Sequence, residues 1–282
     1  MSASHIRLEI VMPDYMQEIF ISAFDGLEFS GFEQFDDRLI AYVDKQKMND
    51  HGREELEKWL VAQRDACFIK SEEVIEERNW NEEWEQSIKP IRIGKFVITP
   101  TWAEPEVSTD DIVLEIDPKM AFGTGYHETT RLILQLLPDV IEKEDRLLDA
   151  GTGTGVLAIA ALKLGASHAL GFDIDEWSYR NATENALLNH VSDRFVIKEG
   201  GAELIDPKVS YDTVLANINR NALMEMTPKL VSVTKSGGNL ILSGLMLNDE
   251  EPMLRHTALR DFDHVKSVYE NEWVAIWLKK KA

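Results

Sequence analysis

The sequence predicts an α/β domain, built on a mostly parallel seven-stranded sheet that ends in an antiparallel hairpin, preceded by a small α+β domain. Three observations lead to this fold class. From Arg146 onward, runs with the period of strands alternate with runs of helical period. A glycine-rich loop follows the first of these strands. Near the C-terminus, His264–Tyr269 and Trp273–Leu278 are strands joined by a short polar turn, without a helix between them.

The seven strands expected in the larger domain are 146–150, 169–173, 194–198, 213–217, 239–245, 264–269 and 273–278. The helices expected between them are 155–164, 176–189, 221–234 and 248–260. Strands alternating with helices imply a parallel sheet covered on both faces. Two further short strands, 91–99 and 111–115, are expected ahead of this alternation.

The first 70 residues predict a ferredoxin-like domain. Strands are expected at 5–10, 31–35, 38–43 and 66–70, with helices at 15–24 and 54–64. Residues 71–90 are charged, and Trp80 and Trp84 stand four apart, as a pair on one helix face does. We therefore expect a first domain over 1–70, a linker helix over 71–90 and a second domain over 91–282.

Composition narrows the class of protein. Hydrophobic residues make up 44% of the 282, which suits a globular protein with a sizeable core. The sequence contains no run of about 18 apolar residues, the length that would indicate a membrane span. Cys67 is the single cysteine and cannot form an internal disulfide. We expect a cytoplasmic, monomeric protein.

The net charge of −20 argues against binding to free nucleic acid, which normally requires a basic surface. Residues 1–90 hold 21 acidic and 10 basic side chains, so about half of the excess lies in the first third of the chain. Such a surface favours a basic protein partner, for example a ribosomal protein. The alternative is that the negative charge only keeps the protein soluble.

The glycine loop predicts a nucleoside-containing cofactor. Gly151, Gly153 and Gly155 follow a buried strand and precede a helix, so backbone N–H groups can approach a ligand closely. A dinucleotide fold would place its third glycine at position 156, where Val156 stands. The spacing G-x-G-x-G, with Asp173 22 positions after Gly151, is typical of class I S-adenosylmethionine (SAM) methyltransferases. A glycine-rich turn without a ligand and a dinucleotide site remain alternatives.

Asp173 and Asn217 each end a predicted strand, so both should lie at the edge where open α/β sheets bind ligands. The Asp173 carboxylate can accept hydrogen bonds from both ribose hydroxyls. The Asn217 amide can hold the amino-acid part of the cofactor, or accept an N–H from an incoming amine and orient its lone pair. Asp175 is expected to cap the following helix. An asparagine that merely starts a turn is the other reading of Asn217.

The segment Phe122–Thr130 is a second glycine cluster. Thr129 or Thr130 is expected to cap the helix that follows, with its hydroxyl near a ligand. Phe122 and Trp102 are candidates to cover the adenine or flank the sulfonium. His127 and Glu128 are possible metal ligands, but no further ligand residue stands at suitable spacing in the sequence. We therefore expect no metal site.

Several segments together resemble the bacterial ribosomal protein L11 methyltransferases (PrmA type). They are, in chain order, N-W-N-E-E-W at 79–84, D-P-K-M-A-F-G-T-G-Y-H-E-T-T at 117–130, L-D-A-G-T-G-T-G at 148–155, D-I-D at 173–175 and A-N-I at 216–218. The resemblance is closest at 122–130. The N-terminal third resembles the family only in size and inferred topology.

This resemblance implies a SAM-dependent enzyme that methylates the α-amino group and lysine ε-amino groups of one large-subunit ribosomal protein. It also implies a recognition domain on a flexible linker, and it carries the cofactor residues onto Thr130, Gly151, Asp173 and Asn217. Asn219 stands where the family usually has leucine, which puts the shape of the acceptor pocket in question.

Other functions remain open from the sequence. A glutamine or N6-adenine methyltransferase also uses an asparagine at this strand end, but the expected N-P-P-aromatic signature is replaced by Asn217-Ile218-Asn219. A SAM-binding regulator or ribosome assembly factor without turnover is an alternative from a different class.

Overall fold

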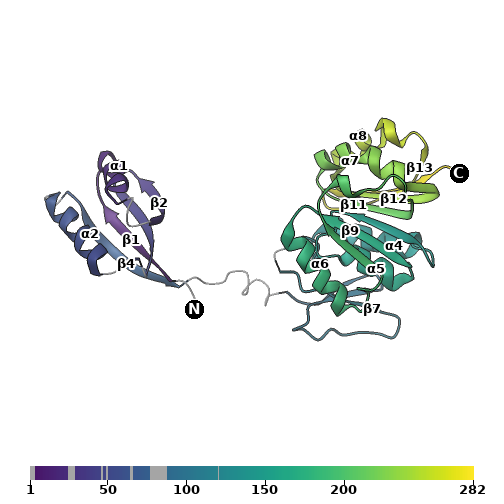
Figure 1. Ribbon diagram of the computed structural model, residues 1–282, viewed down its shortest axis with the longest axis horizontal. Coiled ribbons are helices and arrows are strands. Elements are labelled where there is room, and N and C mark those ends of the chain that lie inside the picture. The colour runs from purple at the N-terminus through teal and green to yellow at the C-terminus, as the bar shows by residue number, and fades with distance from the viewer. Residues whose placement is uncertain are drawn as a thin grey trace. The chain divides into compact units, whose positions relative to one another are not determined.

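The computed structural model describes residues 4–24, 29–45, 47–48, 50–63, 66–76, 88–119 and 121–282. Contacts divide the chain into two compact units, Met1–Trp80 and Asn81–Ala282 (Figure 1). The division falls inside the predicted connecting segment. Trp80 and Trp84 lie in 77–87, the part of the predicted linker helix 71–90 that is outside the described residues.

The larger unit contains the predicted seven-stranded sheet, in the order β10-β9-β8-β11-β12-β14-β13. The first five strands in this order run parallel, β14 pairs antiparallel with β12, and β13 pairs antiparallel with β14. The fold class and its terminal hairpin are therefore confirmed. The strands are β8 (Arg146–Ala150), β9 (His168–Asp173), β10 (Phe195–Glu199), β11 (Tyr211–Asn217), β12 (Thr234–Met246), β13 (Phe262–Glu270) and β14 (Trp273–Lys280).

Helices cover both faces of this sheet because successive strand residues point to opposite sides. Leu147 and Leu215 pack in a core with α4, α5 and α6, whereas Leu148 and Val214 pack in a second core with α7 and α8. Figure 1 shows α4, α5 and α6 on one side of the sheet and α7 and α8 on the other. The helices are α4 (Glu128–Val140), α5 (Val156–Leu164), α6 (Glu176–Leu188), α7 (Arg220–Val233) and α8 (Glu250–Leu254), with short 3-10 turns η2 (Ala202–Leu204), η3 (Leu247–Asp249) and η4 (Thr257–Leu259).

Two sequence predictions need correction in this unit. The expected helix 248–260 is instead split into η3, α8 and η4. Pro252 has no N–H to extend a helix beyond its first turn, and the His256 side chain accepts from Ala258 N–H and starts a new turn. The expected strand 91–99 is two strands, because Gly94 takes a positive φ of 56° and turns the chain. These are β5 (Ile91–Ile93) and β6 (Phe96–Thr99), which form a small sheet with β7 (Ile112–Glu115).

The N-terminal unit has the predicted order of strand, helix, two strands, helix and strand, which is the order of ferredoxin-like domains. Its sheet is antiparallel, with the order β2-β3-β1-β4. The last strand was predicted too short, since residues 71–76 continue it rather than begin the linker. The elements are β1 (Ser4–Val11), α1 (Asp14–Ala23), β2 (Phe29–Phe35), β3 (Arg38–Asp44), α2 (Asp50–Ala62) and β4 (Phe68–Glu76).

One face of this sheet is apolar and the other polar. Along β1, Ile6, Leu8 and Ile10 are buried in the core together with Phe20 of α1 and Leu56 of α2. The side chains between them point to the opposite face, as the two-residue period of a strand requires. Among the described residues, no helix of either unit is long and apolar enough to cross a membrane.

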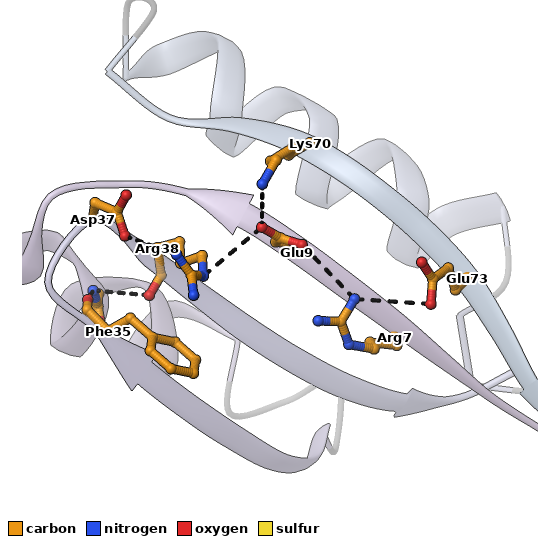
Figure 2. A network of polar contacts seen from close by, with 8 residues as sticks. Arg7, Glu9, Phe35, Asp37, Arg38, Lys70 and Glu73 are labelled. Carbon is orange, nitrogen blue, oxygen red and sulfur yellow. Dashed lines mark hydrogen bonds and ion pairs between the residues drawn. The ribbon is translucent and has the colours of Figure 1, made fainter.

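Glu9 is the centre of a charged network on the polar face (Figure 2). Its carboxylate lies 2.7 Å from Lys70 Nζ, 3.8 Å from Arg38 Nε and 3.9 Å from an Arg7 guanidinium nitrogen, and Arg7 also approaches Glu73. The hydrogen bond from Lys70 lowers the pKa of the Glu9 carboxyl below its usual value, and the two guanidinium groups act in the same direction. These ion pairs therefore link β1 to both β3 and β4.

We predict that Glu9→Gln destabilises the N-terminal unit at neutral pH, with an effect that disappears in acid. A carboxyl whose pKa is lower in the folded chain stabilises the fold above its unfolded pKa of about 4.5, and this stabilisation is lost as the pH falls below that value. Hydrogen exchange of the β1 amides at pH 7 and pH 3.5 measures it. Glu57→Gln, on the exposed side of α2, is the control. Equal loss from both variants at pH 7 would contradict the prediction.

Candidate methyl-transfer site

The candidate site lies at the carboxyl ends of β8, β9 and β11. The chain passes from β8 to β9 on one side and places β11 on the other side of β8. Such a switch point leaves a crevice where open α/β sheets bind ligands. A pocket of about 290 Å³ opens here, lined by Phe122, Gly151, Gly153, Phe172, Asp173, Ile174, Gly200, Gly201, Asn217, Ile218, Asn219, Ala222 and Met226.

The glycine loop is held by close backbone contacts. Gly153 has a φ of 54°, and a Cβ there would lie 2.2 Å from the carbonyl oxygen of Phe122. A Cβ at Gly151 would lie 2.2 Å from the Ile218 side chain. The N–H groups of Gly151 and Thr152 both donate to the Phe172 carbonyl, at 2.9 and 3.0 Å. Glycine is therefore required here by the neighbouring protein segments themselves.

Asp173 ends β9 and lines the pocket as predicted. Its Oδ2 accepts the Gly153 N–H at 3.0 Å, and its Oδ1 accepts the Asp175 N–H at 3.1 Å. Each carboxylate oxygen keeps a further lone pair for a ligand. The predicted capping by Asp175 is confirmed, since its side chain accepts from Trp177 N–H and Ser178 N–H at the start of α6.

Asp149 lies directly below the loop and was not singled out from the sequence. Its side chain is fully buried, and its Oδ2 accepts a hydrogen bond from Thr152 Oγ1 at 2.7 Å. Burial raises the pKa of the Asp149 carboxyl to about 7, the bond from Thr152 opposes the rise, and the charge of Asp173 adds to it. An acid that ends a strongly apolar strand was the signal available in the sequence.

Asn217 lines the pocket and contacts Thr130, 87 positions earlier in the chain, which is not itself among the lining residues. Asn217 Nδ2 lies 3.4 Å from Thr130 Oγ1, and the Thr130 side chain is fully buried. The other amide atom, Asn217 Oδ1, is buried and has no hydrogen-bond partner in the described part of the chain. A buried acceptor left unpaired is unfavourable, so a small rotation of the Asn217 amide toward the pocket, where a ligand could donate to this oxygen, would relieve the penalty.

The helix after Phe122–Thr130 begins differently from the prediction. His127 is the N-cap of α4, and its Nδ1 accepts from the Thr129 N–H at 3.3 Å. Thr129 and Thr130 are inside the helix because it starts two residues earlier than the expected cap. The ring of His127 packs between Phe122 and Trp273, with centroid distances of 5.1 and 4.8 Å.

Two anchors hold this segment in place. Thr154 N–H donates to the Phe122 carbonyl at 2.8 Å, and Tyr126 Oη both donates to the Lys89 carbonyl and accepts from the Lys89 N–H, at 2.6 and 2.7 Å. Phe122 lines the pocket. Trp102 is exposed and is absent from the described lining.

Asn219 also lines the pocket and has a local structural role. Its Oδ1 accepts the Ala222 N–H at 3.1 Å and so caps α7. A leucine at this position could not provide this hydrogen bond, whose loss typically costs about 1 kcal/mol. Over the residues that the structure describes, His, Cys, Asp and Glu side chains form no cluster of three that could hold a metal ion.

The sheet with its terminal hairpin, and the pocket at the switch point, define a class I methyltransferase. Residues 21–281 match the family described as ribosomal protein L11 methyltransferase (PrmA). The chain belongs to this family, which confirms the resemblance found in the sequence motifs. Membership makes the protein a SAM-dependent methyltransferase.

Individual relatives support the same assignment over nearly the whole chain. A ribosomal protein L11 methyltransferase of Chlorobaculum parvum is 35% identical over 285 residues, covering 99% of this chain and 97% of the relative. One from Bacteroides fragilis is 35% identical and covers 88% of this chain and 89% of the relative. A crystal structure of ribosomal protein L11 methylase from Lactobacillus delbrueckii subsp. bulgaricus matches with a TM-score of 0.63 and 29% identity, over 69% of this chain and 100% of that chain.

We predict that Asp149→Asn removes part of the pH dependence of stability of the larger unit. A carboxyl whose pKa is raised on folding stabilises the fold below its unfolded pKa of about 4, and this contribution is lost as the pH rises to about 7. Relative to the variant, the wild type should therefore lose stability between pH 4 and pH 7, by a few kcal/mol. Urea unfolding at pH 5 and pH 8 measures this, with the exposed Asp193→Asn as control. If the free energy of unfolding of wild type and of Asp149→Asn changed with pH in parallel, Asp149 would not be the source of this pH dependence.

Proposed function

We propose that this protein transfers methyl groups from SAM to the α-amino group and lysine ε-amino groups of ribosomal protein L11. The observation that carries the proposal is Asn217, which lines the pocket, donates with Nδ2 to Thr130 and keeps a buried Oδ1 that has no partner in the described chain. An N–H donor satisfies it, and both an amine substrate and the amino group of SAM are such donors. The names of the relatives, ribosomal protein L11 methyltransferase, support the choice of substrate.

The residues around the pocket fit SAM. The Asp173 carboxylate would accept the ribose hydroxyls with the lone pairs that its two backbone contacts leave free. The loop of Gly151 and Gly153 would approach the sugar and amino-acid parts, and Phe122 would cover the ligand from the side. Thr130 would act through its contact with Asn217, since its side chain is fully buried.

The chemistry requires alignment more than proton transfer. When bound, SAM supplies a methyl group already activated by its positively charged sulfur. A lysine amine has a pKa near 10.4, so freeing its lone pair at pH 7 costs roughly 4 to 5 kcal/mol. The pocket, lined largely by apolar side chains and glycines, lowers this cost because burial disfavours the ammonium form.

Asn217 is proposed to orient the deprotonated amine. Its Oδ1 would accept one amine N–H, while its Nδ2 donates to Thr130 Oγ1 and holds the amide at the end of β11. The amine lone pair would then point along the direction of transfer, and the proton would leave to water beforehand. No strong general base is needed for this sequence of events.

The N-terminal unit is proposed to recognise the substrate. It contains 18 acidic and 9 basic residues within Met1–Trp80, which suits a basic ribosomal protein and disfavours nucleic acid. We further propose that the protein acts in the cytoplasm as a monomer, with the recognition domain predicted over 1–70 extended to the end of β4 at Glu76 and the catalytic domain over 91–282.

Labelled SAM and a total ribosomal protein extract test the proposal directly. One labelled protein, identified as L11 by mass spectrometry with methylated amines, is the expected result. Label in RNA or on a glutamine side chain would indicate another methyltransferase. Bound SAM without transferred label would indicate a binding protein without turnover.

We predict that Asp173→Asn weakens SAM binding by about tenfold to a hundredfold, because a charge-assisted pair of hydrogen bonds is lost. Calorimetric titration of the full chain with SAM measures the affinity. Asp175→Asn is a matched control, since it lies two residues away and its carboxylate caps α6. An affinity for SAM that is unchanged in Asp173→Asn would remove this residue from the site.

We predict that Asn217→Ala lowers kcat by more than about tenfold, because the amine loses the acceptor that orients it. Single-turnover transfer from saturating SAM to L11 measures the chemical step. Asn221→Ala, an exposed asparagine on α7, is the control and should react like wild type. Wild-type turnover and SAM affinity in Asn217→Ala would contradict the proposed role.

A further inference from the structure

An apolar band leads from the candidate pocket to the edge of the larger unit. Phe122 lines the pocket, its ring lies 5.1 Å from that of His127, and the His127 ring lies 4.8 Å from that of Trp273. Trp273 pairs in register with Met246 across β14 and β12, and Leu247 follows at the start of η3. Ring contacts and strand pairing thus link the first four of these residues, and Leu247 is the next residue in the chain; the five are here called the mouth band.

The outer part of the mouth band is exposed. Phe122, Met246 and Leu247 are 50%, 47% and 44% accessible, although each is a large apolar side chain. Their backbone is well held, since Leu247 N–H donates to the Glu272 carbonyl at 2.9 Å. Large apolar side chains that are exposed, adjacent and fixed in place are typical of a contact surface for another molecule.

Carboxylates surround this band in excess over cations. They are Glu128, Asp249, Glu250, Glu270 and Glu272. Arg131 pairs with Glu128 and Glu270, and Arg220 pairs with Asp249 at 2.9 Å. In the described chain, no ion pair is seen for Glu250 or Glu272, although Glu250 accepts a hydrogen bond from Tyr269 Oη at 3.0 Å. The buried Oε2 of Glu270 accepts no hydrogen bond from the described residues.

The first turn of α4 connects the mouth band to Asn217. Thr130 contacts Asn217, His127 lies inside the band, and Glu128 accepts a hydrogen bond from Asn271 in the turn between β13 and β14 at 2.8 Å. The band therefore ends beside the residue proposed to hold the acceptor amine, and not at an unrelated part of the surface.

We propose that the mouth band binds the polypeptide segment that carries the methyl-accepting amine. The segment it fits is positively charged, to match the surrounding carboxylates, and presents an apolar side chain close to the amine, to cover Met246 and Leu247. The inference rests on the proposed function and adds a second contact surface, on the catalytic unit, for the same protein substrate.

Steady-state transfer from SAM to intact ribosomal protein L11 by the full chain tests this inference. In Met246→Lys, the KM for L11 should rise about tenfold or more, because the variant places a cation against a cationic segment and removes apolar contact. kcat at saturating L11 and the affinity for SAM should stay near wild type. Leu247→Lys is a second variant, to be used if Met246→Lys does not fold. It should show the same rise in the KM for L11.

The matched control is Val265→Lys, which changes a side chain of 45% accessibility on β13, outside the mouth band. An unchanged KM in the folded band variants would overturn the inference, as would an equal rise in Val265→Lys or an equal loss of SAM affinity. If wild-type protein transferred no methyl group to L11, the proposed function would fail and this inference with it. Transfer by the wild type with the same KM in every variant would overturn the inference alone.

Discussion

The close approach of two loops at Gly153 is the constraint on which the site depends. Its N–H reaches Asp173, and the space that a Cβ would occupy is taken by the Phe122 carbonyl, 2.2 Å from that position. Because it has no side chain, Gly153 can fix the positions of both the Asp173 carboxylate, at the end of β9, and the segment that contains Phe122. Any larger residue would have to displace backbone, which cannot move as a flexible side chain can. The glycine loop therefore links neighbouring segments of the protein, in addition to lining the ligand pocket.

The first turn of α4 has the corresponding role on the acceptor side. Thr130 contacts Asn217, His127 packs between two aromatic rings, and Arg131 donates to Glu270 at the end of β13. The antiparallel hairpin that identifies the fold is thus also a support for the site. Contacts of this kind join residues more than 80 positions apart, so a single displaced hairpin would disturb cofactor and acceptor sides together.

Local sequence determined which parts of this arrangement could be predicted. The parallel sheet, its hairpin, the glycine loop and the positions of Asp173 and Asn217 follow from strand periodicity and from motifs a few residues long. The pKa of Asp149 could not be predicted, because it depends on burial by distant segments. The cap of α4 was placed too late, since a histidine is an uncommon cap and its ring is held by Trp273. The split of 248–260, in contrast, has a local cause, since Pro252 lacks an N–H and the His256 side chain starts a new turn.

Unpaired buried polar atoms are costly, so a protein keeps them only where another requirement outweighs stability. Asp149 Oδ1 and Asn217 Oδ1 both show no hydrogen-bond partner in the described chain. Asn217 is the last residue of β11, and Asp149 is the next-to-last residue of β8. Asp149 can relieve its penalty by binding a proton, because burial has already raised its pKa to about 7. An amide has no such option. Asn217 can be satisfied only by a hydrogen-bond donor from outside the described chain, which is why its oxygen, more than any apolar lining residue, argues for an N–H group bound at this edge of the sheet.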